Sequence, residues 1–263
     1  MVPEPAPTSA PRVVLLGASN LTRGISTVVG TAQSILDAPG EYLIAMGHGR
    51  SYGRPSRVLA RTLPGIDECG LWTALRGRAD RPTYALLTDV GNDIAYGHDV
   101  ETILEWLDRC FGRLIDVKAR VVVTLLPMAS LEGLSPWRYR LARTLLFPGS
   151  RLSLAEALSR ASRLNEGLRA LGRDHGVRLV EHEERWYGLD PVHIRRRFLV
   201  SAWRHILGGW RDEPAGGRGI RPSVARWVRL RRLTPQRWWL LGRELGREQP
   251  AGRLPDGATV SVF

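Results

Sequence analysis

Short apolar runs alternate along the chain with longer segments whose apolar residues recur at helical spacing. The runs at 12–16, 41–46, 84–90, 120–126 and 177–180 predict buried strands. Between and after them, helical stripes predict amphipathic helices over 22–36, 99–115, 154–171 and 194–207. Strands that alternate with helices favour a parallel sheet covered on both faces. We therefore expect an α/β fold, a three-layer α/β/α arrangement with a flavodoxin-like parallel sheet.

The chain divides into three parts by composition. Residues 1–11 carry no basic segment followed by an apolar one, so we expect a disordered leader rather than a signal peptide. Residues 12–208 hold the alternating pattern and form the predicted main domain. A stretch rich in Gly, Pro and charge then opens a small C-terminal extension, 209–263, which ends in a turn signal and a short strand. No apolar run is long enough to span a membrane, and we expect a cytoplasmic protein.

Charge changes this picture little. The formal net charge is +12, and Lys118 is the one lysine among the basic residues, so arginine is used almost exclusively. Nucleic-acid binding would need basic residues on one face with aromatic side chains among them. Trp227, Trp238 and Trp239 lie among arginines in the extension, but packing of a small basic unit or a contact between copies of the chain is the favoured interpretation. Nucleic acid is therefore a disfavoured partner, and a homo-oligomer through the extension stays open.

A serine follows the first predicted strand at the turn into a helix. In the segment Gly17-Ala18-Ser19-Asn20, the glycine ends the strand and Ser19 begins the next element. The carboxyl edge of a parallel sheet is where ligands of open α/β folds bind. A serine exposed there, near the positive end of a helix dipole, suits a nucleophile, although a helix cap is the commoner role of such a residue.

A second pair of polar residues comes after the fifth strand, in Asp190-Pro191-Val192-His193. We expect this segment to open the helix over 194–207, where a spacing of three puts both side chains on one face. The carboxylate of Asp190 could then hold the Nδ1–H of His193 and leave Nε2 free as a base.

Two further segments offer hydrogen-bond donors at the same edge. Asn92 follows the third strand in Gly91-Asn92-Asp93, and its amide could donate to a developing oxyanion, although an asparagine after a strand is usually a turn residue. The loop Gly47–Gly53 is rich in glycine, and its spacing misses the dinucleotide-binding fingerprint. Such a loop suits a close approach of backbone N–H groups to a substrate.

These four segments, in this order, resemble the four blocks of the SGNH (GDSL-type) hydrolases, over about residues 12–207. The resemblance implies Ser19 as nucleophile, His193 as general base and then acid, and Asp190 as the residue that orients it. It implies an oxyanion hole from the Ser19 N–H, Asn92 and a loop glycine, for which Gly53 is the best match and Gly49 and Gly47 are alternatives. One residue departs from the family: Ala18 stands where an aspartate usually precedes the serine.

The resemblance implies a serine-dependent ester hydrolase that acts on a small ester or an O-acetyl group without a cofactor. His182, Glu183 and Glu184 lie close together, but metal-ligand spacing is missing and we expect no metal site. Cys69 and Cys110 are the two cysteines and make no disulfide framework. The alternative is a non-catalytic protein of the same fold whose basic extension contacts nucleic acid or a partner subunit.

Overall fold

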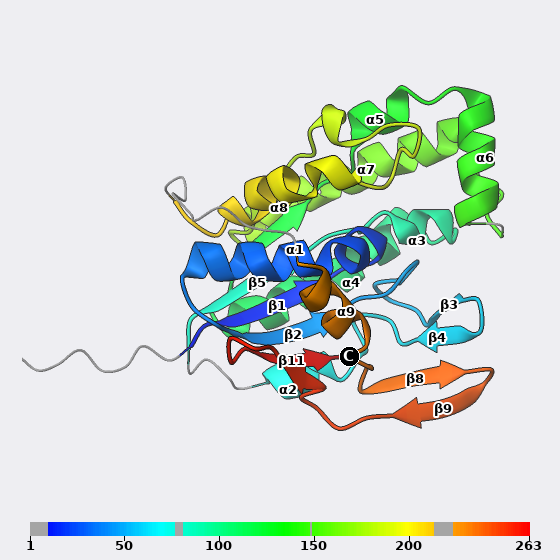
Figure 1. Ribbon diagram of the computed structural model, residues 1–263. Helices are drawn as coiled ribbons and strands as arrows, with labels where there is room; N and C mark the ends of the chain where they lie inside the picture. Colours follow the sequence, from blue (N-terminus) through cyan, green and yellow to red (C-terminus); the bar gives the residue numbers. More distant parts are fainter. Residues whose placement is uncertain (1–9, 77–80, 148, 213–222) are drawn as a thin grey trace, which may run out of the picture.

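The computed structural model describes residues 10–76, 81–147, 149–212 and 223–263. Its centre is a seven-stranded sheet of order β10-β11-β2-β1-β5-β6-β7 (Figure 1). Every neighbouring pair in this sheet is parallel except β10 with β11. The strands are β1 (Arg12–Leu16), β2 (Glu41–Ala45), β5 (Thr83–Leu87), β6 (Arg120–Thr124), β7 (Arg178–Val180), β10 (Gly252–Arg253) and β11 (Thr259–Val262).

Helices cover both faces of this sheet, which confirms the three-layer α/β prediction. One face packs on α2 (Leu71–Leu75), α4 (Val100–Asp116) and α7 (Leu154–Asp174). The other packs on α1 (Ser19–Leu36), α8 (Leu199–Gly208) and α9 (Val224–Arg231). Successive strand residues point to opposite faces, so Val14 and Leu16 of β1 join the first cluster while Val13 and Leu15 join the second.

The remaining elements lie around the carboxyl edge of the sheet. A second, antiparallel sheet of order β3-β4-β8-β9 joins two distant parts of the chain. Its strands are β3 (Ser56–Val58), β4 (Arg61–Leu63), β8 (Arg237–Leu240) and β9 (Arg243–Gly246). The short helices are α3 (Asn92–Ala95), α5 (Met128–Glu132), α6 (Pro136–Leu146), and the 3-10 turns η1 (Glu184–Trp186) and η2 (Arg196–Phe198).

The C-terminal segment is built into the main body, not appended to it. Strand β11 inserts beside β2 in parallel register, and the N–H of Phe263 donates to the carbonyl oxygen of Ile44 at 2.9 Å. Val260 and Phe263 are 0% and 2% exposed. The predicted boundary at residue 208 therefore does not separate two packed units, although the predicted final strand is present. Most of the predicted linker and of the predicted leader, residues 213–222 and 1–9, lie outside the described residues.

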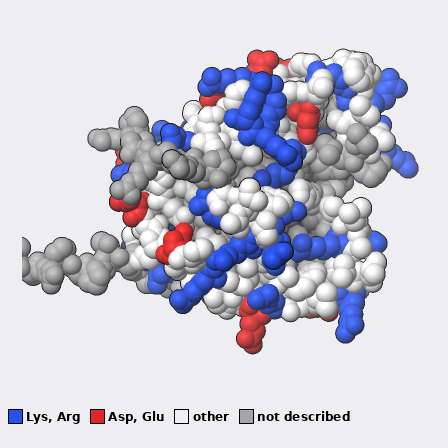
Figure 2. Space-filling model, in the orientation of Figure 1, with Lys and Arg blue, Asp and Glu red and all other residues white. Residues whose placement is uncertain are grey.

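Basic side chains gather across the middle of the face drawn in Figure 2, over α9. In the C-terminal segment the guanidinium of Arg231 lies 5.7 Å from the ring of Trp227, and that of Arg237 lies 4.8 Å from the ring of Trp239. Arg237 also pairs with Glu244 at 2.8 Å. These arginines and tryptophans thus contact one another within the segment. No helix in the described part of the chain is both long and apolar enough to cross a bilayer.

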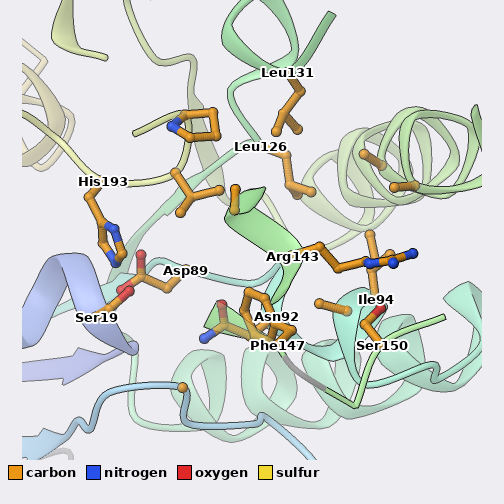
Figure 3. A pocket seen from close by; sticks show the side chains of 18 of the residues that line it. Ser19, Asp89, Asn92, Ile94, Leu126, Leu131, Arg143, Phe147, Ser150 and His193 are labelled. Atoms are coloured by element: carbon orange, nitrogen blue, oxygen red, sulfur yellow. The ribbon is translucent and has the colours of Figure 1, made fainter. Parts of the chain in front are cut away.

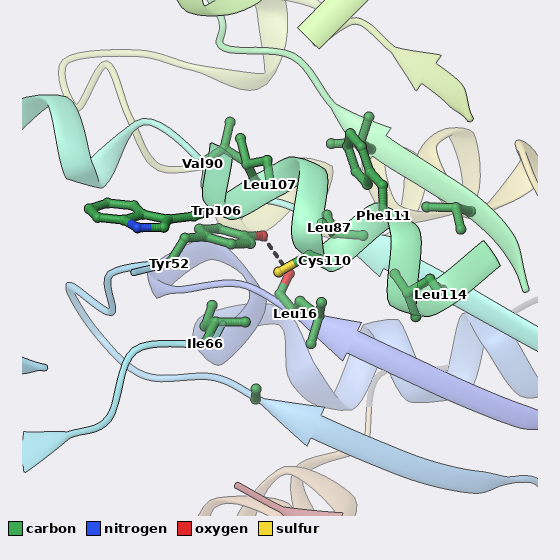
Figure 4. Packing of buried hydrophobic residues seen from close by; sticks show 14 of the residues in the cluster. Leu16, Tyr52, Ile66, Leu87, Val90, Trp106, Leu107, Cys110, Phe111 and Leu114 are labelled. Atoms are coloured by element: carbon green, nitrogen blue, oxygen red, sulfur yellow. Dashed lines mark hydrogen bonds between the residues drawn. The ribbon is translucent and has the colours of Figure 1, made fainter. Parts of the chain in front are cut away.

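The buried cluster beneath the glycine-rich loop supports the site from below (Figure 4). Tyr52 is fully buried among Ile66, Trp106 and other apolar side chains. Its hydroxyl donates to the carbonyl oxygens of Thr88 and Leu16 at 2.9 and 3.3 Å. Thr88 directly follows β5 and Leu16 is the last residue of β1, so Tyr52 links the loop to the two strands that carry the candidate site.

Candidate active site

The candidate nucleophile lies at a tight turn between β1 and α1. Ser19 is the first residue of α1, two residues after Gly17. A β-carbon on Gly17 would lie 2.6 Å from Cγ2 of Thr88, so a glycine is required for the strand to turn this closely. The turn brings Ser19 to the carboxyl edge of the sheet, as the sequence predicts.

Asp89, which the sequence analysis did not single out, holds this turn. Its Oδ2 accepts hydrogen bonds from the N–H groups of Ala18, Asn20 and Leu21 at 2.8, 3.0 and 3.2 Å. The first N–H groups of a helix have no partner within the helix, and a carboxylate also matches the positive end of its dipole. Ala18, the residue at the cap position, makes no side-chain cap. Asp89, two residues after β5, therefore provides a carboxylate at the start of α1, where Ala18 has no carboxylate of its own.

The backbone of Asp89 is adapted to this contact. Its φ is 61°, in the left-handed region, which aspartate tolerates better than most residues with a side chain. This conformation turns the chain at the end of β5, and its carboxylate reaches back across the neighbouring strand to α1.

Asp190 and His193 make the predicted pair. Nδ1 of His193 lies 2.7 Å from Oδ2 of Asp190, and His193 is 9% exposed. Burial by itself would raise the pKa of Asp190. The hydrogen bond and charge of His193, with the N–H groups of Val192 and His193, outweigh it, and the pKa of Asp190 is lowered. The carboxylate is thus charged at neutral pH and fixes the imidazole with Nε2 facing away.

The pair lies in a loop, so the predicted helix over 194–207 starts too early. The structure has η2 at 196–198 and α8 from Leu199. Asn20 explains this: its Nδ2 donates to the carbonyl oxygen of Val192 at 2.8 Å, and its Oδ1 accepts from the N–H of Ile194 at 2.9 Å. These two bonds bracket His193 and engage the backbone groups that a helix would use internally.

The same Asn20 side chain also contacts Asp89. Its Nδ2 donates to Oδ1 of Asp89 at 2.8 Å. Asp89, Asn20 and the loop around His193 therefore form one continuous hydrogen-bonded chain, which fixes the base relative to the nucleophile turn.

Asn92 and the glycine-rich loop are held together. Nδ2 of Asn92 donates to the carbonyl oxygen of Arg50 at 3.3 Å, which leaves its second hydrogen free to point elsewhere. The neighbouring Asp93 is fully buried, accepts from the hydroxyl of Ser51, and accepts from the N–H of Tyr52 at 2.9 Å. Burial raises the pKa of Asp93, against the opposing effect of these donors. The motif Gly91-Asn92-Asp93 thus anchors the loop.

Gly53, the glycine first predicted as an oxyanion donor, faces the core instead. Its N–H donates to Oγ of Ser51 at 3.2 Å, and a β-carbon there would lie 2.0 Å from the ring of Trp106. Close packing against that ring explains the glycine. Gly49, one of the alternatives, lines the cavity beside Ser19; its φ is 59°, and its carbonyl oxygen accepts from the hydroxyl of Tyr96. The hydrogen bond engages the carbonyl of Gly49 with the end of α3 and fixes the backbone of the loop at this point.

The candidate residues share one cavity. A hollow of about 740 Å³ is lined by Ser19, Asn92 and His193, with Asp190 behind the imidazole. Figure 3 shows Ser19, Asp89 and His193 at one end of it and Asn92 next along its wall. Burial lowers the pKa of His182, also in the wall, to about 4, so this histidine is neutral at pH 7.

His182 does not belong to a metal site in the part of the chain that is described, where no group of three or more His, Cys, Asp or Glu side chains could hold a metal ion. Its Nδ1 contacts the hydroxyl of Tyr187 instead. Cys69 and Cys110 are both buried and unpaired with each other.

No protein-family model matches the sequence, and no curated protein matches it. Among solved structures, a carbohydrate acetylesterase family member from Sinorhizobium meliloti matches with a TM-score of 0.51 and 12% identity, over 74% of this chain and 95% of that one. The chain has the SGNH hydrolase fold. Est24, a carbohydrate acetylesterase from the same bacterium, is similar with 17% identity and a TM-score of 0.48, over 74% of this chain and 96% of that one. An inhibitor-bound aryl esterase from M. smegmatis is similar with 15% identity and a TM-score of 0.49, over 74% of this chain and 95% of that one.

The SGNH resemblance located most of the candidate site but not its supports. It named Ser19, Asn92 and His193, which the structure places around one cavity, and Asp190, which contacts His193. It missed Asp89, a charged residue within the apolar run predicted as a buried strand at 84–90 and two residues before the Gly-Asn-Asp segment, and that placement was the available signal.

Proposed function

We propose that the protein is an SGNH-type carboxylic ester hydrolase that works through an acyl-enzyme on Ser19. The observation that carries the proposal is the shared cavity of Ser19, Asn92 and His193, together with the 2.7 Å contact of His193 with Asp190. A serine hydroxyl is a weak nucleophile until a positioned base takes its proton, and a carboxylate behind the base holds the required tautomer.

In the proposed reaction Oγ of Ser19 attacks the ester carbonyl carbon, and Nε2 of His193 takes the hydroxyl proton. The carbonyl oxygen becomes an oxyanion, and three donors suit it: the amide of Asn92 and the N–H groups of Ser19 and Gly49. Donors fixed in advance cost no reorganisation at the moment of reaction. Ser19 fits this role because the N–H groups of its neighbours donate to Asp89, whereas its own is not among the donors to that carboxylate.

The oxyanion then collapses, the bond to the alcohol oxygen breaks, and His193 returns its proton to the leaving alkoxide. A water molecule, deprotonated by His193, attacks the acyl-enzyme through a second oxyanion. That step releases the carboxylic acid and restores the Ser19 hydroxyl. No cofactor is needed for either half.

The test compares the two serines that line the cavity, Ser19 and Ser150. Ser19→Ala should abolish hydrolysis of an activated ester such as a p-nitrophenyl ester, because the acyl-enzyme cannot form. Ser150→Ala should keep it, because no catalytic role falls to that residue. Equal activity of the two variants would exclude Ser19 as the nucleophile.

A further inference from the structure

The cavity extends well beyond the catalytic groups. Ser19 and His193 occupy one end of its 740 Å³, and the other end runs beneath α5 and α6 against α7. Figure 3 shows Ile94, Arg143 and Ser150 on the side of the cavity away from His193, with Leu126 and Leu131 along the wall between and Phe147 beside Asn92. We call this part of the cavity, lined by Ile94, Leu126, Leu131, Phe147, Leu152 and Ala157, the distal arm.

The distal arm is apolar in character. Two polar side chains of α6 also line the cavity here: Arg143 donates from Nη1 to the carbonyl oxygen of Leu152 at 2.8 Å, and the hydroxyl of Tyr139 donates to the same oxygen at 3.0 Å. Each of these two side chains thus makes a hydrogen bond to the wall itself, and the hydroxyl of Ser150 is a further polar group in the cavity lining. A hydroxylated group such as a sugar would lose hydrogen bonds with water here, whereas an apolar group gains from leaving water.

The chemistry decides which half of an ester enters the distal arm, an argument that rests on the proposed function. His193 must protonate the leaving alkoxide, so the alcohol lies on the His193 side. Asn92 contacts the carbonyl oxygen, and the acyl group continues past it. The distal arm begins at that point, next to Ile94. It is therefore the acyl side of the site.

The volume of the whole cavity, catalytic end included, leaves room for an acyl group larger than acetyl. Cavities of roughly 300–1,000 Å³ hold ligands of drug size, and this one measures about 740 Å³. An acetyl group, which the sequence prediction of an O-acetyl substrate would place here, ends beside Asn92 and leaves the distal arm empty. We propose that the acyl group of the substrate is a long apolar chain seated in the distal arm.

The first experiment measures kcat/KM of the full chain for p-nitrophenyl acetate, butyrate, octanoate and decanoate. Burial of each methylene is worth about 0.8 kcal/mol, which corresponds to about a fourfold increase in kcat/KM for each carbon added. From butyrate to octanoate we expect a gain of roughly 10²-fold. A constant or falling kcat/KM beyond acetate would overturn the proposal.

A matched pair of variants on α7 tests the location. Ala157 lines the distal arm, whereas Ala155, two residues earlier, is exposed to solvent. Ala157→Phe should lower kcat/KM for decanoate at least tenfold and leave that for acetate unchanged, because it fills the distal arm and spares the catalytic end. Ala155→Phe should alter neither. Equal losses for both esters, or no loss for decanoate, would contradict this location.

A binding measurement separates this proposal from the proposed function. Calorimetric titration of Ser19→Ala with acetate and decanoate needs no turnover. If decanoate binds more tightly than acetate, and the added Ala157→Phe weakens its binding, the apolar-chain site is supported. That support holds even if the wild-type protein hydrolyses none of the esters, because the lack of hydrolysis would refute only the proposed hydrolase function. Equal affinities for the two acids would refute the chain site while leaving hydrolysis of acetate intact.

Discussion

The carboxylate of Asp89 makes a sharp test of how the nucleophile turn is held. Asp89→Asn keeps the shape of the side chain and removes its charge. Hydrogen bonds to a charged group contribute about 1.5–3 kcal/mol each, against about 0.5–1.5 for neutral pairs. The three N–H groups on Oδ2 would therefore lose about 1 kcal/mol each, or about 3 kcal/mol together.

A second effect adds to this cost. The Nδ2 of Asn20 donates to Oδ1 of Asp89 at 2.8 Å. If the amide oxygen of the new Asn side chain takes the place of Oδ2 and keeps the three backbone donors, its NH2 group takes the place of Oδ1 and faces the Nδ2 of Asn20. Two opposed donors cost about 1–3 kcal/mol. We expect a loss of about 4–6 kcal/mol in the free energy of unfolding. Domains are typically stable by about 5–15 kcal/mol, so a protein near the upper end of that range would stay folded. We also expect kcat to fall at least 10²-fold, since a displacement near 1 Å of a reacting group has about that effect.

The assay is urea denaturation together with kcat, measured at a temperature where circular dichroism shows the variant to be folded. Asp99→Asn is the control, because Asp99 occupies the cap position of α4 without a side-chain cap hydrogen bond. That variant should stay within about 0.5 kcal/mol of the wild type. If Asp89→Asn matches the wild type in both unfolding midpoint and kcat, Asp89 does not hold the turn.

Three other perturbations follow from the structure. Asn92→Ala should lower kcat by about 10²–10³-fold with little change in KM, because an oxyanion contact forms mainly in the transition state. Steady-state kinetics test this, and a change in KM with kcat unchanged would contradict it. Asp190→Asn should flatten the acid side of the stability profile. The lowered pKa of Asp190 contributes stability that is fully present well above the ordinary value of 3.8 and is lost as pH falls below that value and through the lower pKa of the folded state, so urea midpoints at pH 7 and pH 3 should differ less than in the wild type. Removal of residues 256–263 should unfold the protein, because burial of Val260 and Phe263, at about 1.5–3 kcal/mol each, is lost with β11; a cooperative melt of the truncated chain would refute this.

Elements whose signals are local could be read from the sequence. The apolar run at β1 matches its predicted bounds, and α7 begins at Leu154, the first residue of the helix predicted over 154–171, directly after the capping box of Ser153 and Glu156. In each case the residues that decide the structure are neighbours in the chain, so their spacing carries the information.

Features that depend on distant contacts could not be read in this way. The four residues of β11 give a strand signal, but its partner β2 lies more than 200 positions away, so nothing in the segment indicated insertion into the main sheet. The early start of the last predicted helix has a similar cause, because Asn20 draws the backbone around His193 out of helical geometry across 172 and 174 positions.

The candidate site divides along the same line. Ser19, Asn92, Asp190 and His193 carry side chains suited to the chemistry, and the SGNH resemblance found them by type and order. Gly53 was favoured over Gly49 by position in a motif, yet the packing of Trp106 and the backbone turn at Gly49 decide which glycine faces the cavity.

The central claim, an activated serine at position 19, is tested most directly by covalent labelling. A fluorophosphonate reacts with serines whose hydroxyl is deprotonated by a positioned base, so intact-mass analysis of the full chain reports activation without knowledge of the substrate. We predict a single adduct that peptide mapping assigns to Ser19, no adduct on Ser19→Ala, and an unchanged adduct on Ser150→Ala. A folded wild-type protein that remains unlabelled, or an adduct on another residue, would contradict the account and favour a non-catalytic role for this fold.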